Sequence, residues 1–155
     1  MDAPCVDNDY LQDHVMRLLA GLRHWTGRNL VDPMRPVADQ ARQIYYASFA
    51  VLSHDISADP LLNYANQAAL TLFELSWEEL VITPSRLTAE AIEREQRARL
   101  LATVGAQGYI DDYRGVRISK SGRRFEIERA TVWNLFDEQG AHYGQAAAFS
   151  VWRSL

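Results

Sequence analysis

The chain has 155 residues, of which 48% are hydrophobic and 23% charged, and its formal net charge at pH 7 is −4. This length predicts a single globular domain that is stable without a metal or a disulfide. The acidic balance argues against nucleic acid as the main ligand, and the single cysteine, Cys5, excludes an internal disulfide and a cysteine-based zinc site.

No apolar segment marks the chain for a membrane or for export. The N-terminus lacks the basic start and the apolar run of a signal peptide. No stretch approaches the roughly 18 apolar residues that cross a bilayer. We therefore expect a soluble, cytoplasmic domain that binds neither membrane nor nucleic acid.

The first third of the chain is predicted to be helical. Between positions 10 and 25, apolar residues recur every three or four positions, which is the spacing of an amphipathic helix. Gly27 follows as the expected stop of this helix. A second helix is expected over residues 37–46, after a connection that contains two prolines.

Two short strands and two capped helices are predicted next. Apolar runs at 49–52 and 61–64 are typical of strands, and a turn rich in Ser, Asp and Pro separates them. Asn66 is a favoured helix N-cap, because its side-chain oxygen can accept a hydrogen bond from a free backbone N–H. Ser76 and Glu79 have the spacing of a capping box and predict a further short helix.

The longest helix of the second half is predicted over residues 88–104. Three glutamate and arginine pairs lie four positions apart with the glutamate first, which is the stabilising order on a helix surface. Gly105 and Gly108 are expected to end this helix. The pairs are Glu90 with Arg94, Glu93 with Arg97 and Glu95 with Arg99.

After Gly108 the pattern changes to three long strands. These segments are rich in β-branched and aromatic residues, and polar turns that contain glycine separate them. Because the helices and strands do not alternate, the order favours an α+β domain with an antiparallel sheet. The segments span residues 109–119, 123–136 and 143–152.

One stretch in the middle of the chain resembles a known signature. Residues 62–80 read LNYANQAALTLFELSWEEL and resemble the Y-A-N-x-A and L-F-G-x-S-x-E-E-L pattern of the PAS superfamily. The resemblance implies a five-stranded antiparallel sheet with helices on one face, preceded by N-terminal flanking helices. It indicates the fold more than the function, because PAS domains bind many ligands or none.

Four further runs are similar to the MEKHLA family, a PAS-like group found as small bacterial proteins and at the C-termini of plant homeodomain-zipper regulators. On this basis we divide the chain into a helical extension, 1–46, and a PAS-like domain, 47–155. The family implies a sensory or dimer-regulating module. Because we expect no attached kinase, DNA-binding or cyclase domain, any signal is expected to pass to a protein partner by surface contact. The runs are WTGRNL at 25–30, GVRIS at 115–119, ATVWNL at 130–135 and GQAAAF at 144–149.

Two departures from relatives bear on the cofactor, which stays unassigned. Flavin-binding photosensory relatives carry a reactive cysteine after the signature, whereas Cys5 precedes the first predicted helix. Haem-binding relatives carry a ligating histidine on the long helix, and residues 88–104 contain none. No metal site is predicted either, because the histidines lack ligand spacing and lie at His14, His24, His54 and His142.

A PAS-like cavity would lie between the long helix and the sheet, so strand alternation decides which side chains enter it. On the strand 123–136 we expect the more apolar set to face inward, namely Phe125, Ile127, Arg129, Thr131, Trp133 and Leu135. A guanidinium in such a place is costly without an anion, so we predict a small anionic or aromatic carboxylate ligand. The predicted ligand-binding residues are Tyr113, Arg117, Arg129, Trp133, Gln145 and Phe149.

The arginines also have an alternative interpretation. They could pair with Asp111, Glu126 or Glu128 on neighbouring strands, or lie in water at the rim of the sheet. The domain would then be a ligand-free protein-interaction or dimerisation module. No enzyme is predicted and no catalytic residue is assigned, because the sequence lacks nucleophile-elbow, phosphate-loop and metalloprotease motifs.

The apolar stripe of the first helix has two compatible interpretations. It can dock on the sheet of its own chain, or it can pair with the same helix of a second chain. We predict a homodimer whose interface contains Leu11, Val15, Leu18, Leu22 and Trp25.

Overall fold

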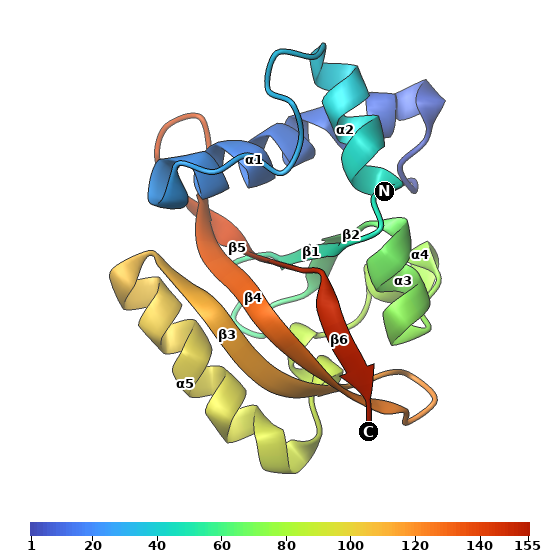
Figure 1. The fold of residues 1–155 in the computed structure, drawn as a ribbon, viewed down its shortest axis with the longest axis vertical. Coiled ribbons are helices and arrows are strands. Elements are labelled where there is room, and N and C mark those ends of the chain that lie inside the picture. Colours follow the sequence, from blue (N-terminus) through green and yellow to red (C-terminus); the bar gives the residue numbers. More distant parts are fainter.

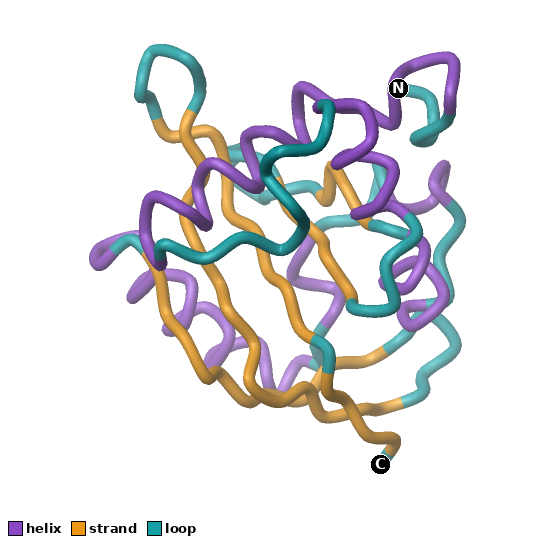
Figure 2. The backbone as a smooth tube through the Cα atoms, turned by 45° about the horizontal axis from the view of Figure 1, so that its top comes forward, coloured by secondary structure: helices purple, strands orange, loops and turns teal.

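An antiparallel sheet forms the centre of the molecule, and helices pack on both of its faces (Figure 1; Figure 2). The computed structural model describes residues 1–90 and 93–155 in full, and the backbone of the two positions between them. Within the described residues, no helix is both long and apolar enough to cross a membrane.

The sheet has the strand order β2-β1-β5-β4-β3, with β6 paired to β4. The predicted antiparallel α+β fold is confirmed, with one difference in the last strand. Ser150 interrupts that strand, so β5 pairs with the second half of β4 and β6 with its first half. The strands are β1 (Ala50–His54), β2 (Leu62–Ala65), β3 (Tyr109–Ile118), β4 (Arg124–Phe136), β5 (His142–Phe149) and β6 (Val151–Ser154).

The helices begin and end close to the predicted positions. Gly27 ends the first helix in the left-handed region with φ of 73°, and Ser76 forms the predicted capping box with Glu79. The long helix continues through Gly105 and ends at Gly108, so the stop expected at Gly105 is wrong. The elements are η1 (Val6–Leu11), α1 (Gln12–Thr26), α2 (Val37–Tyr45), α3 (Gln67–Phe73), α4 (Trp77–Leu80), η2 (Ser85–Thr88) and α5 (Ala91–Gln107).

The apolar stripe of α1 docks on the sheet of its own chain, on the face opposite α5. Val15, Leu18 and Leu22 are buried there. The Trp133 indole on β4 donates a hydrogen bond to the Leu18 carbonyl at 3.1 Å. Leu11 and Trp25 are only half-buried. A dimer interface built from the whole stripe would require α1 to leave the sheet first.

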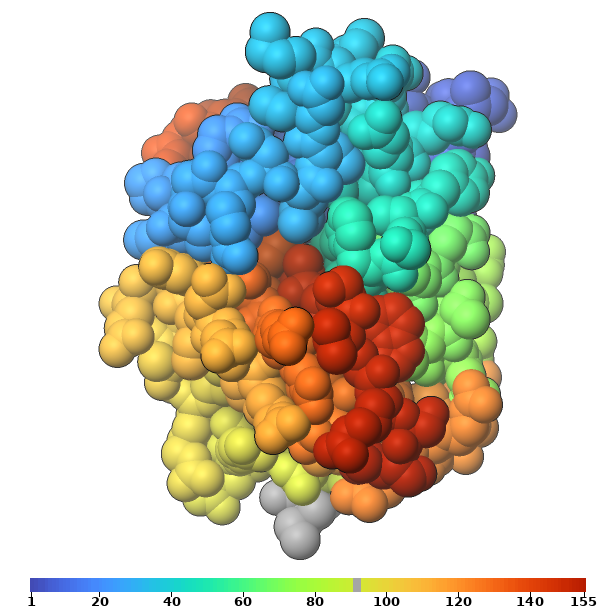
Figure 3. Space-filling model, in the orientation of Figure 1, coloured from blue at the N-terminus to red at the C-terminus, as the bar shows by residue number. Residues whose placement is uncertain are grey.

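Residues of the helical extension share one core with the sheet domain. Ala41 and Ile44 of α2 are fully buried in the same apolar cluster as Val51 of β1. Figure 3 shows α1 and α2 covering the upper part of this face, while β3, β4 and β6 reach the surface below them. The domain boundary at residue 46 stays a prediction. In the structure, the segments on either side of it pack into one core.

Asn66 links three elements through its buried side chain. Its Oδ1 accepts hydrogen bonds from the backbone N–H of Val51 and, as the predicted N-cap of α3, of Ala69. Its Nδ2 donates to the carbonyls of Ile44 and Phe49. One amide therefore satisfies four backbone groups, at the end of α2, just before and within β1, and at the start of α3.

We predict that Asn66→Ala lowers the free energy of unfolding by about 2–4 kcal/mol, because it leaves buried backbone groups without partners. Urea denaturation followed by circular dichroism measures this change. Asn29→Ala is the matched control, since Asn29 is exposed and its side chain bonds only Arg23 among the described residues. A loss no larger than that of the control would contradict the role of Asn66.

A second polar group, the half-buried His14, anchors α1 to the sheet. Its Nε2 lies 2.9 Å from Ser53 Oγ and its Nδ1 lies 3.0 Å from the Tyr143 hydroxyl. The Ser53 hydroxyl donates a hydrogen bond to Asn63 Oδ1 at 2.6 Å. Burial, and then the positive charge of Arg17, lower the pKa of His14 from 6.5 to about 4. The imidazole is therefore neutral in the folded protein at pH 7.

The free energy of unfolding should fall as the pH is lowered from about 6.5 to 4, because His14 binds a proton in the unfolded chain over this range but stays neutral in the folded protein. Between pH 7 and pH 5 we expect a loss of about 2 kcal/mol from this group. Urea denaturation at the two pH values measures it. His14→Gln should reduce the difference by that amount, and the exposed His142→Gln should not. An unchanged pH dependence in His14→Gln would refute the assignment.

Candidate functional site

A β-bulge at Arg129 changes the alternation of β4. Before it, Phe125 packs against Phe73 of α3, and Ile127 lines the space under α5. Arg129 has φ of 53°, in the left-handed region, and β3 and β4 shift register beside it. Beyond the bulge, Val132 faces α5, whereas Trp133 faces α1.

The bulge overturns part of the expected inward-facing set. Phe125 and Ile127 point inward as predicted, but the later members are on the other side of the strand. Trp133 packs against α1, and Arg129 is exposed. One extra residue inverts every side chain beyond it, because side chains alternate with a period of two. The inward orientation predicted for Arg129, Thr131, Trp133 and Leu135 is therefore wrong.

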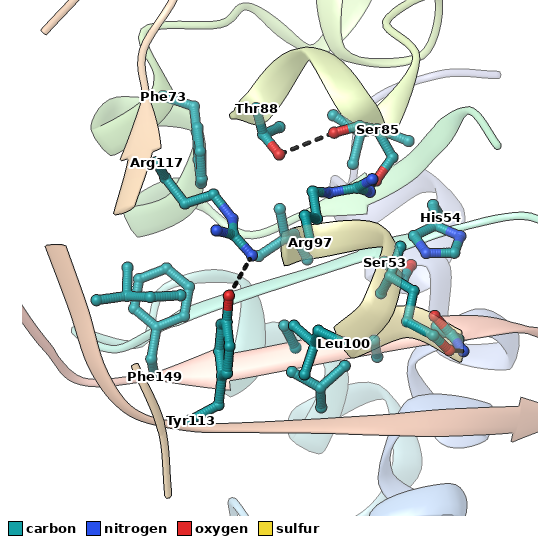
Figure 4. A pocket seen from close by; sticks show the side chains of 18 residues that line it. Ser53, His54, Phe73, Ser85, Thr88, Arg97, Leu100, Tyr113, Arg117 and Phe149 are labelled. Carbon is teal, nitrogen blue, oxygen red and sulfur yellow. Dashed lines mark hydrogen bonds between the residues drawn. The ribbon is translucent and has the colours of Figure 1, made fainter. Parts of the chain in front are cut away.

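A small cavity lies between α5, η2 and the sheet (Figure 4). Its volume is about 60 Å³. Four predicted ligand-binding residues line it: Tyr113, Arg117, Gln145 and Phe149. The structure adds polar residues that the sequence interpretation missed, namely His54, Ser85 and Arg97.

Arg117 enters the cavity from β3 and is 9% exposed. It donates hydrogen bonds to the Val116 carbonyl at 2.8 Å and to the Tyr113 hydroxyl at 3.3 Å. Its guanidinium carbon lies 5.5 Å from the centroid of the Tyr113 ring. Gly115 makes this arrangement possible, because a Cβ there would lie 2.3 Å from the Tyr113 hydroxyl.

Arg97 enters the same cavity from α5 and is 8% exposed. Its guanidinium donates a hydrogen bond to the Ser85 hydroxyl on η2, and Figure 4 shows it reaching across the cavity to that wall. Burial, and then the charge of Arg117, lower the pKa of Arg97 to about 10. The group is therefore still positively charged at pH 7.

The spacing of α5 contained a signal for Arg97. Arg97 shares one helix face with Leu100 and Val104, which are both buried, at intervals of three and seven residues. The sequence interpretation instead assigned Arg97 to a surface pair with Glu93. Among the described side chains, Glu95 with Arg99 is the one predicted pair that forms an ion pair, with its charged atoms 3.7 Å apart.

Neither buried guanidinium has an acidic partner among the described side chains. The three acids proposed as partners bind other arginines on the surface. Asp111 pairs with Arg28 at 3.1 Å, and Glu126 and Glu128 pair with Arg114 and Arg153. Two largely buried positive charges in one cavity, without a counter-ion among the described side chains, are electrostatically unfavourable. This arrangement can accept an anion.

His54 lines the cavity from β1 and differs chemically from the two arginines. Its Nδ1 lies 2.9 Å from the Asp55 carbonyl oxygen, which can only accept a hydrogen bond. Nδ1 therefore carries the proton, and Nε2 is an acceptor. Nε2 is buried and has no hydrogen-bond partner in the described structure. Burial lowers the pKa of this imidazole.

Comparison with known proteins identifies the family. The MEKHLA domain model matches residues 12–154. The chain belongs to the MEKHLA family. This MEKHLA domain is 28% identical to the homeobox-leucine zipper proteins ATHB-9 and ATHB-14 of Arabidopsis thaliana, over 113 and 112 residues. The matches cover 72% and 71% of the chain, which spans only 13% of the length of each relative.

Solved structures confirm that the MEKHLA domain has a PAS-like fold. A PAS domain from Colwellia psychrerythraea superposes with a TM-score of 0.63 at 18% identity, covering 76% of this chain and 94% of that one. An RNA-binding light-oxygen-voltage receptor gives 0.62 at 19% identity, covering 80% of this chain and 36% of the receptor. At these identities the likeness establishes the fold alone.

We predict that Arg97→Met raises the free energy of unfolding of the ligand-free MEKHLA domain by about 1–4 kcal/mol, because it replaces an unpaired buried charge with an apolar side chain of similar volume. Urea denaturation measures the change. Arg114→Met is the control, since it removes an exposed, paired guanidinium and should cost at most about 1 kcal/mol. A destabilised Arg97→Met would show that the charge is compensated within the chain.

Proposed function

We propose that this MEKHLA domain is a sensory module that binds a small carboxylate in the cavity under α5. The observation that carries the proposal is the pair of buried guanidinium groups, Arg97 and Arg117, without an acid beside either of them in the described structure. Arginine presents paired N–H donors that match the two oxygens of a carboxylate. A bound carboxylate would supply the missing negative charge.

The size of the cavity restricts the class of ligand. A volume of about 60 Å³ is well below the roughly 300–1,000 Å³ of common ligand pockets. It favours a short aliphatic acid over the aromatic acid that the sequence also suggested. With at most about −1.5 kcal/mol per non-hydrogen atom, such a ligand binds no more tightly than roughly micromolar.

The alternative function is a ligand-free interaction module. The small volume favours it, because large side chains fill most of the space between α5 and the sheet. The two unpaired arginines argue against it. A ligand-free interaction module would carry two unpaired charges in its core without a function for them, because apolar residues at the positions of Arg97 and Arg117 would stabilise the fold more.

Isothermal titration calorimetry of the full chain tests the proposal. Acetate and propionate at neutral pH and low ionic strength should give saturable binding with a Kd between about 10 µM and 1 mM. Arg97→Met and Arg117→Met should each weaken binding at least about tenfold, since each removes a charge-assisted hydrogen bond.

Arg129→Met is the matched control for both variants, because Arg129 is the other arginine that the sequence predicted beside Arg117, and it is exposed outside the cavity. It should leave the Kd unchanged. The absence of heat with both acids up to 10-fold above the upper Kd, about 10 mM, would refute carboxylate binding. Equal weakening by Arg129→Met would also refute it, because binding would then follow the net charge of the protein.

A further inference from the structure

The cavity has a hydrogen-bond acceptor that no group of the described chain satisfies. His54 pairs with Gln145 across β1 and β5, so both side chains are on the face toward α5. Its Nδ1 proton is committed to the Asp55 carbonyl, which leaves Nε2 with a free lone pair. A buried polar atom without a partner costs about 1–3 kcal/mol, so it needs a donor.

No described side chain donates a hydrogen bond to Nε2 of His54. The Gln145 amide nitrogen already donates to the Leu101 carbonyl at 3.2 Å and to Asn134 Oδ1 at 3.0 Å. The Arg97 guanidinium donates to the Ser85 hydroxyl instead. Burial, and then the field of Arg97, disfavour protonation of the imidazole, so His54 does not become a donor itself near neutral pH.

The cavity therefore combines two cations with one neutral acceptor. A ligand that matches both must carry an anionic group and a hydrogen-bond donor. An ammonium donor would lie close to two guanidinium groups and be repelled, whereas a hydroxyl donor is neutral. A hydroxyl adds only one non-hydrogen atom, which the limited volume tolerates better than a longer chain.

We infer that the ligand is a small hydroxycarboxylate, whose carboxylate binds Arg97 and Arg117 and whose hydroxyl donates a hydrogen bond to Nε2 of His54. The inference rests on the proposed function and specifies its ligand. It assigns selectivity to His54, because a buried acceptor left unpaired penalises the acid that lacks the hydroxyl.

Matched pairs of acids test the inference on the unmodified full chain. Calorimetry compares lactate with propionate and glycolate with acetate, so that each pair differs only in the hydroxyl. We expect each hydroxy acid to bind about tenfold more tightly than its partner, as one additional hydrogen bond to a buried acceptor implies. Equal affinities within both pairs would overturn the hydroxyl assignment and leave carboxylate binding intact. No binding by any of the four acids would overturn both.

A variant then locates the selectivity. His54→Leu removes the acceptor and keeps an apolar group of similar size, so the lactate to propionate ratio should fall to about one. His142→Leu is the matched control, because His142 is an exposed histidine on β5, and the ratio should stay at about ten. A ratio that stays high in His54→Leu would assign the hydroxyl contact to another residue. If His54→Leu does not fold, the comparison of acids in the unmodified chain decides alone.

Discussion

The β-bulge at Arg129 determines which side chains of β4 point toward α1 and which point toward α5. A non-glycine residue in the left-handed region costs about 1–2 kcal/mol, and this one is placed within the longest strand of the sheet. In return, the second half of β4 turns Trp133 toward α1 and Val132 toward α5. On the α1 side the indole is fully buried and donates a hydrogen bond to the Leu18 carbonyl. Without the bulge, an indole would fill the cavity under α5.

Because Trp133 is removed from that side, the cavity is bounded by side chains that stabilise the fold poorly. Arg97 and Arg117 bring charge into an apolar space, and His54 brings an acceptor without a donor. On the surface of the same strands, Arg114 forms ion pairs with both Glu126 and Glu128. These exposed charges are thus paired, whereas the buried Arg97 and Arg117 have no acidic partner among the described side chains, which is the opposite of what stability alone favours.

Sequence patterns predicted the parts of this structure that depend on local chemistry. Asn66 and Ser76 cap their helices as expected, and the order of helices and strands identified the fold. Alternation failed at Arg129, because arginine carries none of the preference for left-handed backbone that Gly or Asn would have shown. Arg97 was missed for a different reason. A helix-surface pair with Glu93 and an inward position both fit its spacing, and only the packing of α5 decides between them.

Strand β1 connects the cavity to α1 through two consecutive residues. Consecutive residues of a strand point to opposite faces, so Ser53 turns toward α1 while His54 turns toward the cavity. Ser53 hydrogen-bonds His14 of α1, and His54 is the acceptor that faces the two arginines. A displacement of His54 along its strand would therefore move the anchor of α1 by the same backbone step. The N-terminal helix and the cavity, although separated by the sheet, contact adjacent residues of one strand.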